Sequence, residues 1–416
     1  MWVRFVIIFI IVLLAEIYCY ILIRSVIKSL PIYLRGSIMA FYLVITAFYW
    51  LYLLLLNRTD IIIKMPIGLQ NFCNTLFTGL LIGKVLVMLV MLIDDIRRVI
   101  VWAFTTLFPL KTDSTLPHDA ITRSIFMKRL ALLLGGSAVL GFMYGTSNKY
   151  NYQVRKIKIK FPNLPESFRG LRMVQVSDIH TGSFDSHKDV ENGINKILEL
   201  KPDIIFFTGD LVNNIADEIT DEYHTIFSKL SAPMGVYSIL GNHDYGDYKT
   251  WASTEAKEQN LNKLKNHHYT MGWRLLINEH LVFERADDKI ALLGIENWSA
   301  KAHFPKYGDL MKAYEGLKEK NIPFKILLSH DPSHWDEQVF PDYKDINLTL
   351  SGHTHGMQFG VDSKYFKWSP VQYMYNKWAG LYGTENQYLY VNRGFGFLGY
   401  KGRIGIMPEI TLIELA

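Results

Sequence analysis

Four apolar runs in the first 150 residues constrain this chain more than any other feature of its sequence. They span residues 2–23, 37–56, 76–93 and 130–144. A helix of about 20 apolar residues crosses a hydrocarbon core of about 30 Å. The last run is shorter and rich in Gly and Ala. We predict a transmembrane region of four helices over residues 1–150, with residues 99–108 as an interfacial or re-entrant segment.

Two ionisable residues lie deep inside these runs, Glu16 in the first and Lys84 in the third. Charged groups at this depth are rare and usually face a partner or a cavity. They indicate either a proton or substrate path, or a structural ion pair between helices, or a lysine that reaches the interface. We favour the structural interpretation.

Lys and Arg are concentrated in two of the loops between the apolar runs. Nine follow the first and third runs: Arg24, Lys28, Arg35, Arg97, Arg98, Lys111, Arg123, Lys128 and Arg129. The loop after the second run has only Arg58 and Lys64. Because cytoplasmic loops are enriched in basic residues, we predict a multi-pass protein of the cell membrane whose C-terminal part is extracytoplasmic. The basic residues between Lys149 and Lys160 argue for the opposite orientation.

The pattern changes at about residue 152, where short apolar runs begin to alternate with amphipathic stretches. Residues 190–200 and 307–320 have helical spacing, and 251–266 is a charged, helical excursion. Six runs are typical of buried strands: 172–176, 203–208, 236–240, 290–295, 325–328 and 346–350. This alternation predicts an α/β domain over residues 151–416, with helices outside the sheets.

Composition excludes several classes of protein. Residues 1–150 hold 14 Lys and Arg against 6 Asp and Glu, whereas the remainder holds 30 against 33. The folded C-terminal part therefore offers no basic groove, and we expect no nucleic-acid partner. The two cysteines, Cys19 and Cys73, both lie in the apolar part. They exclude a disulfide framework and a cysteine-based zinc site.

Polar residues that suit a metal follow five of the predicted strands. The motifs are Ser177-Asp178-Ile179-His180, Gly209-Asp210, Gly241-Asn242-His243-Asp244, Ser329-His330-Asp331 and Gly352-His353-Thr354-His355-Gly356. Sites in α/β sheets assemble at the carboxyl ends of strands, so we expect these motifs to meet. Histidine with carboxylate favours Mn, Fe or Zn over Ca or Mg alone. In an extended segment, both side chains of Asp-x-His or His-x-His point the same way.

One such motif is common by chance, but five in order, each after an apolar strand, predict a metal centre. The other eight histidines have no such context, and we interpret them as structural or surface residues: His118, His187, His224, His267, His268, His280, His303 and His334.

The series D-x-H, G-D, G-N-H-D, a lone His and G-H-x-H resembles that of the calcineurin-like metallophosphoesterase superfamily. Residues 391–396 and 403–410 resemble the end of its membrane-anchored branch. The resemblance covers residues 160–416. It implies a four-layer sandwich of two β-sheets flanked by helices, with a dinuclear metal site at one edge. Here that domain would follow the four-helix transmembrane region.

The resemblance also implies a role for each motif residue. Asp178, His180 and His355 would hold the first of two divalent metal ions. Asn242, His330 and His353 would hold the second, and Asp210 would bridge both. His243 would be the catalytic histidine that stabilises the phosphoryl oxygens or protonates the leaving group, with Asp244 orienting it.

These roles predict a membrane-anchored phosphoesterase that hydrolyses a phosphate mono- or diester with metal-activated water. An aromatic and basic stretch, residues 364–382, follows the last motif closely. It is typical of either a membrane interface, which favours a lipid-linked substrate, or ordinary loop packing. Two alternatives remain: a membrane transporter or sensor with a regulatory metal-binding domain, and a nuclease.

Overall fold

The computed structural model describes residues 2–55, 65–108, 119–301, 304–317, 319–384 and 386–416. The chain divides into two compact units, Met1–Gly145 and Thr146–Ala416. Leu56 of the second predicted span, the loop residues Arg58, Lys64 and Lys111, and the histidines His118 and His303 lie outside the described ranges.

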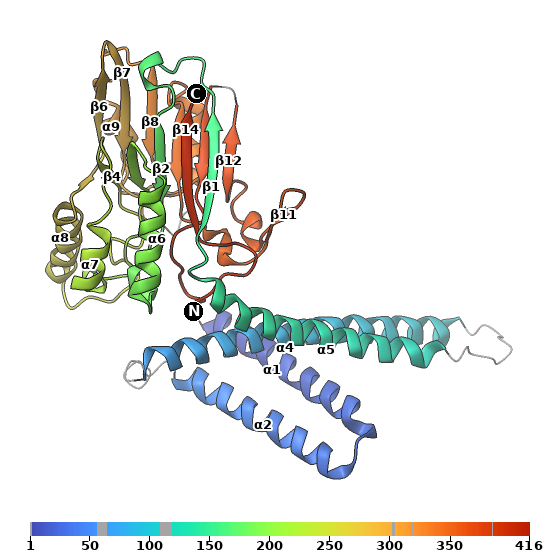
Figure 1. Ribbon diagram of the computed structural model, residues 1–416. Helices are drawn as coiled ribbons and strands as arrows, with labels where there is room; N and C mark the ends of the chain where they lie inside the picture. Colours follow the sequence, from blue (N-terminus) through green and yellow to red (C-terminus); the bar gives the residue numbers. More distant parts are fainter. Residues whose placement is uncertain (1, 56–64, 109–118, 302–303, 318, 385) are drawn as a thin grey trace. The chain divides into compact units, whose positions relative to one another are not determined.

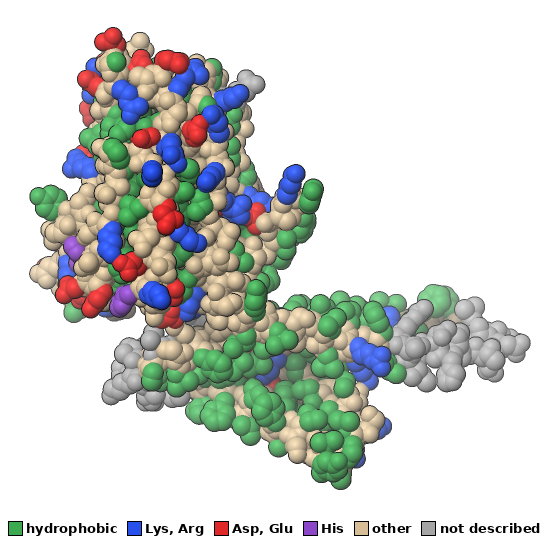
Figure 2. Space-filling view, viewed as in Figure 1, with side chains coloured by type: hydrophobic (Ala, Val, Ile, Leu, Met, Phe, Trp, Pro, Cys, Tyr) green, Lys and Arg blue, Asp and Glu red, His purple; other side chains and the backbone are tan. Residues whose placement is uncertain are grey.

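The N-terminal unit consists, over its described residues, of four long helices. They are α1 (Trp2–Val26), α2 (Ile32–Leu55), α4 (Ile67–Leu107) and α5 (Asp119–Gly145) (Figure 1). All four are long and apolar enough to cross a membrane. Hydrophobic side chains cover most of their visible surface (Figure 2).

Helix α4 differs from the prediction, because residues 99–108 do not form a separate segment. The 41-residue helix continues to Leu107, since no proline or glycine interrupts it after Gly83. At 1.5 Å per residue its length is about 60 Å, about twice the hydrocarbon thickness. Arg97 and Arg98 both pair with Asp94 on the same helix, at 2.9 and 2.7 Å.

Glu16 and Lys84 form the ion pair that the structural interpretation predicted. The Lys84 Nζ lies 2.6 Å from Glu16 Oε2, and Thr46 donates a hydrogen bond of 2.8 Å to Glu16 Oε1. The pair links α1, α2 and α4. Helices α4 and α5 also approach closely, because a Cβ on Gly83 would lie 2.7 Å from the Gly135 carbonyl oxygen.

The described part of the C-terminal unit contains two six-stranded mixed sheets (Figure 1). The first has the order β1 (Gln153–Ile159), β14 (Glu409–Leu415), β2 (Arg172–Val176), β3 (Ile204–Phe207), β4 (Val236–Ser238) and β5 (Trp273–Leu275). The second has the order β12 (Gly380–Gly383), β13 (Tyr388–Val391), β9 (Leu348–Ser351), β8 (Phe324–Leu328), β7 (Asp288–Gly294) and β6 (Glu279–Arg285). A small antiparallel hairpin joins β10 (Val361–Asp362) to β11 (Lys367–Trp368).

Alternating side chains build the four layers that the family resemblance implied. Met173 of β2 packs with Leu292 and Leu328 of the second sheet in the central core. Val174 of β2 faces the opposite way, where α6 (His187–Glu199), α7 (Asp221–Phe227) and α8 (Thr254–Thr270) cover the first sheet. On the second sheet, Leu293 packs with α9 (Leu310–Tyr314) and the π-helix Trp335–Val339.

All six predicted strands are present, but the helix predicted over residues 307–320 is much shorter. Asp309 caps α9 by accepting a hydrogen bond of 2.9 Å from the Lys312 amide. The helix ends at Tyr314, and Gly316 adopts a left-handed φ of 75° that breaks the helical path.

Candidate metal centre

The carboxyl ends of parallel strands from both sheets bring the predicted residues together. In the first sheet, β2, β3 and β4 run parallel, and Asp178, Asp210 and Asn242 follow them in turn. In the second, β8 and β9 run parallel, and His330 and His353 follow them. Parallel strands end at one edge of a sheet, so each sheet presents its motifs on one side.

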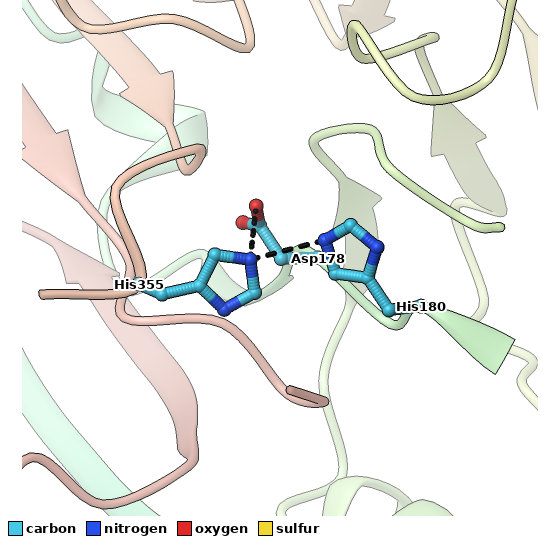
Figure 3. A group of neighbouring side chains, drawn as sticks. All are labelled: Asp178, His180 and His355. Carbon is cyan, nitrogen blue, oxygen red and sulfur yellow. Dashed lines mark hydrogen bonds and ion pairs between the residues drawn. The ribbon is translucent and has the colours of Figure 1, made fainter. Parts of the chain in front are cut away.

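Asp178, His180 and His355 form the first cluster, in which all three side chains point toward one another (Figure 3). The His355 Nε2 lies 3.2 Å from Asp178 Oδ1 and 3.0 Å from His180 Nε2. Two imidazole nitrogens at this distance can share a tautomeric N–H or flank a cation. Burial lowers the pKa of His180, so its ring is favoured in the neutral form, which is the form that binds a metal ion. Burial opposes ionisation of Asp178, but His355 holds its pKa below the usual range.

Asp210, His330 and His353 form the second cluster. The His330 Nδ1 donates a hydrogen bond of 2.7 Å to the Thr208 carbonyl, which leaves Nε2 as the nitrogen that faces the site. This Nε2 is buried, has no hydrogen-bond partner among the described residues, and lies 3.1 Å from Asp210 Oδ2. Burial opposes protonation, yet Asp210 raises the pKa of His330 to about 10. The buried carboxylate thus favours a positive charge beside it, which protonated His330 supplies and which a bound metal ion would supply in its place.

Asp210 lies between the two clusters. Its Oδ2 is 3.1 Å from His330 Nε2 and 3.6 Å from His180 Nε2, while its Oδ1 accepts a hydrogen bond of 2.8 Å from the His243 amide. Burial opposes ionisation, but His330 and His243 hold the pKa of Asp210 well below its usual range. An ionised carboxylate in this position suits the bridging role that the resemblance implies.

Two tyrosines outside the predicted ligand set also contact the site: Tyr248, which the sequence did not single out, and Tyr375. His353 Nδ1 lies 2.7 Å from Asn242 Oδ1, and the Asn242 amide donates to the Tyr248 hydroxyl at 2.8 Å. The other ring nitrogen of His353 lies 2.9 Å from the Tyr375 hydroxyl, which donates to Asp331 at 3.3 Å. Tyr375 belongs to the aromatic stretch after the last motif, and that stretch was its sequence signal.

Asp244 makes backbone contacts that the resemblance did not imply. Its carboxylate accepts hydrogen bonds of 2.8–3.2 Å from four backbone amides, those of Asp210, Leu211, Val212 and Gly241. The His243 ring is held by the Asn213 carbonyl, 2.8 Å from its Nδ1. The Asp244 carboxylate thus binds the backbone of the loop that carries Asp210, and the His243 ring contacts Asn213; the orienting role of Asp244 stays a prediction. Burial and the charge of Asp210 raise the pKa of Asp244 to about 7.

The local backbone also differs from the extended segments that we expected for Asp-x-His and His-x-His. Asp178, His180, Asp210, His353 and His355 all adopt left-handed φ values between 50° and 72°. Such values cost about 1–3 kcal/mol per residue and persist where the surroundings impose them. Gly352 shows how tight the site is, because a Cβ there would lie 1.9 Å from Ser177 Oγ. The side chains thus converge through tight turns.

The donor set fits two divalent ions. Each cluster offers three Asp and His ligand atoms within 4.8 Å of one another, in buried or nearly buried surroundings. The Nε2 of His330 has no hydrogen-bond partner among the described residues, and the Nε2 atoms of His180 and His355 face each other at 3.0 Å. Cations between these groups would satisfy all three.

Comparison with known proteins agrees with this geometry. Residues 171–357 match the calcineurin-like phosphoesterase family, and residues 3–149 match the probable calcineurin-like phosphoesterase transmembrane domain. The uncharacterized metallophosphoesterase YkuE of Bacillus subtilis is 30% identical over 310 residues, which cover 71% of this chain and 98% of that protein. This chain belongs to the calcineurin-like phosphoesterases. It is a multi-pass membrane protein of that family, which comprises hydrolases acting on phosphoric esters and using divalent metals.

Two further relatives carry more specific names. The transmembrane protein with metallophosphoesterase domain of Danio rerio is 32% identical over 309 residues, which cover 72% of this chain but 65% of that protein. UDP-2,3-diacylglucosamine pyrophosphatase LpxG of Chlamydia trachomatis is 29% identical over 303 residues, covering 61% of this chain and 86% of that protein. This chain therefore resembles metallophosphoesterases of both bacteria and animals, and the animal relative is named as a transmembrane protein.

Proposed function

We propose that this chain is a membrane-tethered phosphoesterase that hydrolyses a phosphate mono- or diester with the help of two divalent metal ions. One observation carries the proposal. Seven side chains from five separate strand ends converge on two adjoining clusters: Asp178, His180, Asp210, Asn242, His330, His353 and His355. Bound cations would offset the charge of the ester and make water a better nucleophile.

The chain's own residues would divide the remaining work. Ionised Asp210 lies next to both clusters and would hold them at a fixed separation. Asn242 is a neutral donor and would keep negative charge away from an anionic substrate. The His243 Nδ1 is bound to the Asn213 carbonyl, so Nε2 is left to contact the phosphoryl oxygens or the leaving group.

The proposed metals are Mn, Fe or Zn. Each cluster combines histidine nitrogen with carboxylate oxygen, a ligand set that suits these ions better than Ca or Mg alone. Metal analysis of the purified protein identifies which of them is bound.

Alanine variants of Asp210 and His243 test the reaction. With a chromogenic phosphodiester, we expect turnover to fall at least about 100-fold in both Asp210→Ala and His243→Ala. Metal content should fall only in Asp210→Ala. Asp217→Ala is the matched control, because Asp217 is exposed and pairs with Lys263 on the surface. Unchanged turnover in both site variants would falsify the proposal.

We further propose that the substrate is lipid-linked. Three observations support this: the chain is membrane-embedded, LpxG by its name acts on a diacylated sugar nucleotide, and Tyr375 brings the aromatic stretch into contact with His353. Turnover on vesicles that carry a lipid phosphoester should exceed turnover on the soluble ester of the same headgroup. Equal turnover on both would argue against a lipid substrate.

The proposed orientation places the catalytic unit outside the cytoplasm. It rests on the nine basic residues in the first and third loops. A single cysteine introduced at the exposed Tyr269, in a chain without Cys19 and Cys73, should react with a membrane-impermeant maleimide in intact cells. If the cysteine at position 269 reacts with the maleimide only after lysis of the cells, the catalytic unit lies in the cytoplasm.

The alternative functions have less support. A transporter or sensor would need intramembrane charges that face a pathway, whereas Glu16 and Lys84 pair with each other. A nuclease would need a basic groove, and residues 151–416 carry slightly more acidic than basic side chains.

A further inference from the structure

The hairpin that joins β10 to β11 exposes aromatic side chains that the catalytic site does not use. At its tip, Tyr365 is 91% exposed and Phe366 is 58% exposed, with Lys364 beside them. The hairpin projects from the body of the C-terminal unit (Figure 1), and hydrophobic and basic side chains cover it (Figure 2). Exposed aromatic rings flanked by lysine are typical of groups that lie at the headgroup level of a bilayer.

Hydrogen bonds close the hairpin turn and ion pairs hold its base, in a conformation that leaves both rings exposed. Ser363 and Phe366 close the turn with two hydrogen bonds of 3.0 Å, from the Ser363 amide to the Phe366 carbonyl and from the Phe366 amide to Ser363 Oγ. At the base, Asp362 pairs with Arg155 and, at 3.0 Å, with Arg393. A rigid turn loses little conformational entropy when it binds a surface.

Chain connectivity limits how far the base of the hairpin can lie from the end of the last membrane helix. Helix α5 ends at Gly145 and β1 begins at Gln153, so seven residues separate them. Such a segment spans at most about 30 Å. Arg155, which pairs with Asp362, is only two residues further along β1. The base of the hairpin is therefore anchored to the strand that follows the last membrane helix.

The hairpin is also continuous with the candidate metal centre. Val361 follows His355 by six residues, and Ser369, directly after β11, donates a hydrogen bond of 2.8 Å to the Gly356 carbonyl. The return path leads to Tyr375, which contacts His353. A membrane surface bound at the tip would thus be connected to His353 and His355 through a short, ordered segment.

We propose that the tip of this hairpin, residues 363–366, inserts into the headgroup region of the bilayer in which the chain's own helices lie. The rings of Tyr365 and Phe366 enter the interface, and Lys364 contacts lipid phosphate. Two anchors, the helices and the hairpin, then fix how the metal centre faces the membrane. This inference holds whichever ester is hydrolysed.

A depth measurement on the full chain tests the proposal. The protein, with Cys19→Ala and Cys73→Ala, is placed in nanodiscs of phosphatidylcholine and phosphatidylglycerol and labelled with an environment-sensitive fluorophore at Tyr365→Cys. The matched control is Tyr269→Cys on α8, where the native side chain is 80% exposed. We expect nitroxide-labelled lipid to quench the label at position 365 at least threefold more than at 269. Iodide in the buffer should show the reverse order.

Two outcomes overturn the inference. If both positions are quenched alike, the tip lies in water. If the label at 365 is shielded from iodide without being quenched by lipid, the tip is covered by protein. Because the readout needs no substrate, it stands even if the chain fails to hydrolyse any ester, and so the two proposals can fail separately.

Discussion

The two units of this chain bury ionisable side chains in opposite ways. In the membrane unit, the Lys84 Nζ lies 2.6 Å from Glu16 Oε2, and Thr46 donates a hydrogen bond to the other carboxylate oxygen. The centre of the Tyr49 ring lies 4.9 Å from the Lys84 Nζ. In the catalytic unit, His330 Nε2 lacks a hydrogen bond among the described residues, and two imidazole nitrogens face each other at 3.0 Å. The first arrangement is complete without a ligand, and the second is complete only with cations.

This difference separates a structural charge pair from a site. Buried polar groups are normally satisfied, so a group of them that lacks partners requires an explanation. Mutual neutralisation in an ion pair explains why Glu16 and Lys84 can both be buried. The second cluster has an ionised carboxylate and two ring nitrogens, and without a metal its positive charge comes only from protonation of His330 beside Asp210, a position that a metal ion would take.

The largest expected effect comes from removing metal. Treatment with a chelator should abolish turnover of the chromogenic ester, and adding Mn²⁺ or Zn²⁺ should restore it. Occupancy at about 100 times the dissociation constant stabilises the fold by about 2.7 kcal/mol, so the melting temperature should fall with the metal. Full activity of the chelated protein would show that the two clusters of the catalytic unit do not need cations.

Breaking the membrane pair should affect stability rather than catalysis. Lys84→Met leaves Glu16 buried without its partner and should cost about 3–5 kcal/mol of unfolding free energy. The double variant Glu16→Gln with Lys84→Met should recover most of this loss, because no unpaired charge remains. Thermal unfolding in detergent measures the change in stability, and ester turnover per folded molecule measures the change in catalysis. A double variant that is stable yet inactive would favour a pathway through the helices.

His268 is a control for the site histidines, because it is buried and distant from any proposed ligand in sequence. Its Nδ1 lies 3.0 Å from the Ser238 hydroxyl, while its Nε2, like that of His330, has no hydrogen-bond partner among the described residues. Burial lowers its pKa to about 3. Its neutral form is favoured in the fold, so its contribution is complete above the unfolded pKa of about 6.5 and is lost as the pH falls toward 3.

Between pH 7 and pH 5 this histidine should therefore cost the fold about 2 kcal/mol. In His268→Gln the drop in melting temperature between these two pH values should be smaller than in the unmodified chain. An identical drop in both proteins would show that His268 does not titrate as its burial requires.

Asp244→Asn should have the smallest effect. The carboxylate accepts from four backbone amides, and an amide side chain would turn one acceptor into a donor. One buried amide would lose its partner, at a cost of about 1–3 kcal/mol. Chemical denaturation measures this loss. If turnover fell about 100-fold with unchanged stability, Asp244 would act on His243 after all.

Much of the catalytic unit was predictable because its signals are local. Six of its strands are apolar runs that end in polar turns, and each ends within a few residues of its predicted limit. The strand β1 was missed because three lysine or arginine residues alternate with its apolar ones, which resembles a charged connecting segment. It becomes a strand only by pairing with β14, Gln153 opposite Glu409, more than 250 residues later.

The sequence by itself determined which residues have metal chemistry and which segments suit a bilayer, because residue type and spacing are sufficient for both. Only the tertiary structure decided which residues hydrogen-bond to the site residues. Asn213 contacts His243, Asp244 binds backbone amides, and Tyr375 reaches His353. These contacts join segments that lie 22 to 34 residues apart, and left-handed turns at the ligands direct the side chains. No local pattern encodes these contacts, since each forms only when loops that are separate in the sequence come together at the edge of a sheet.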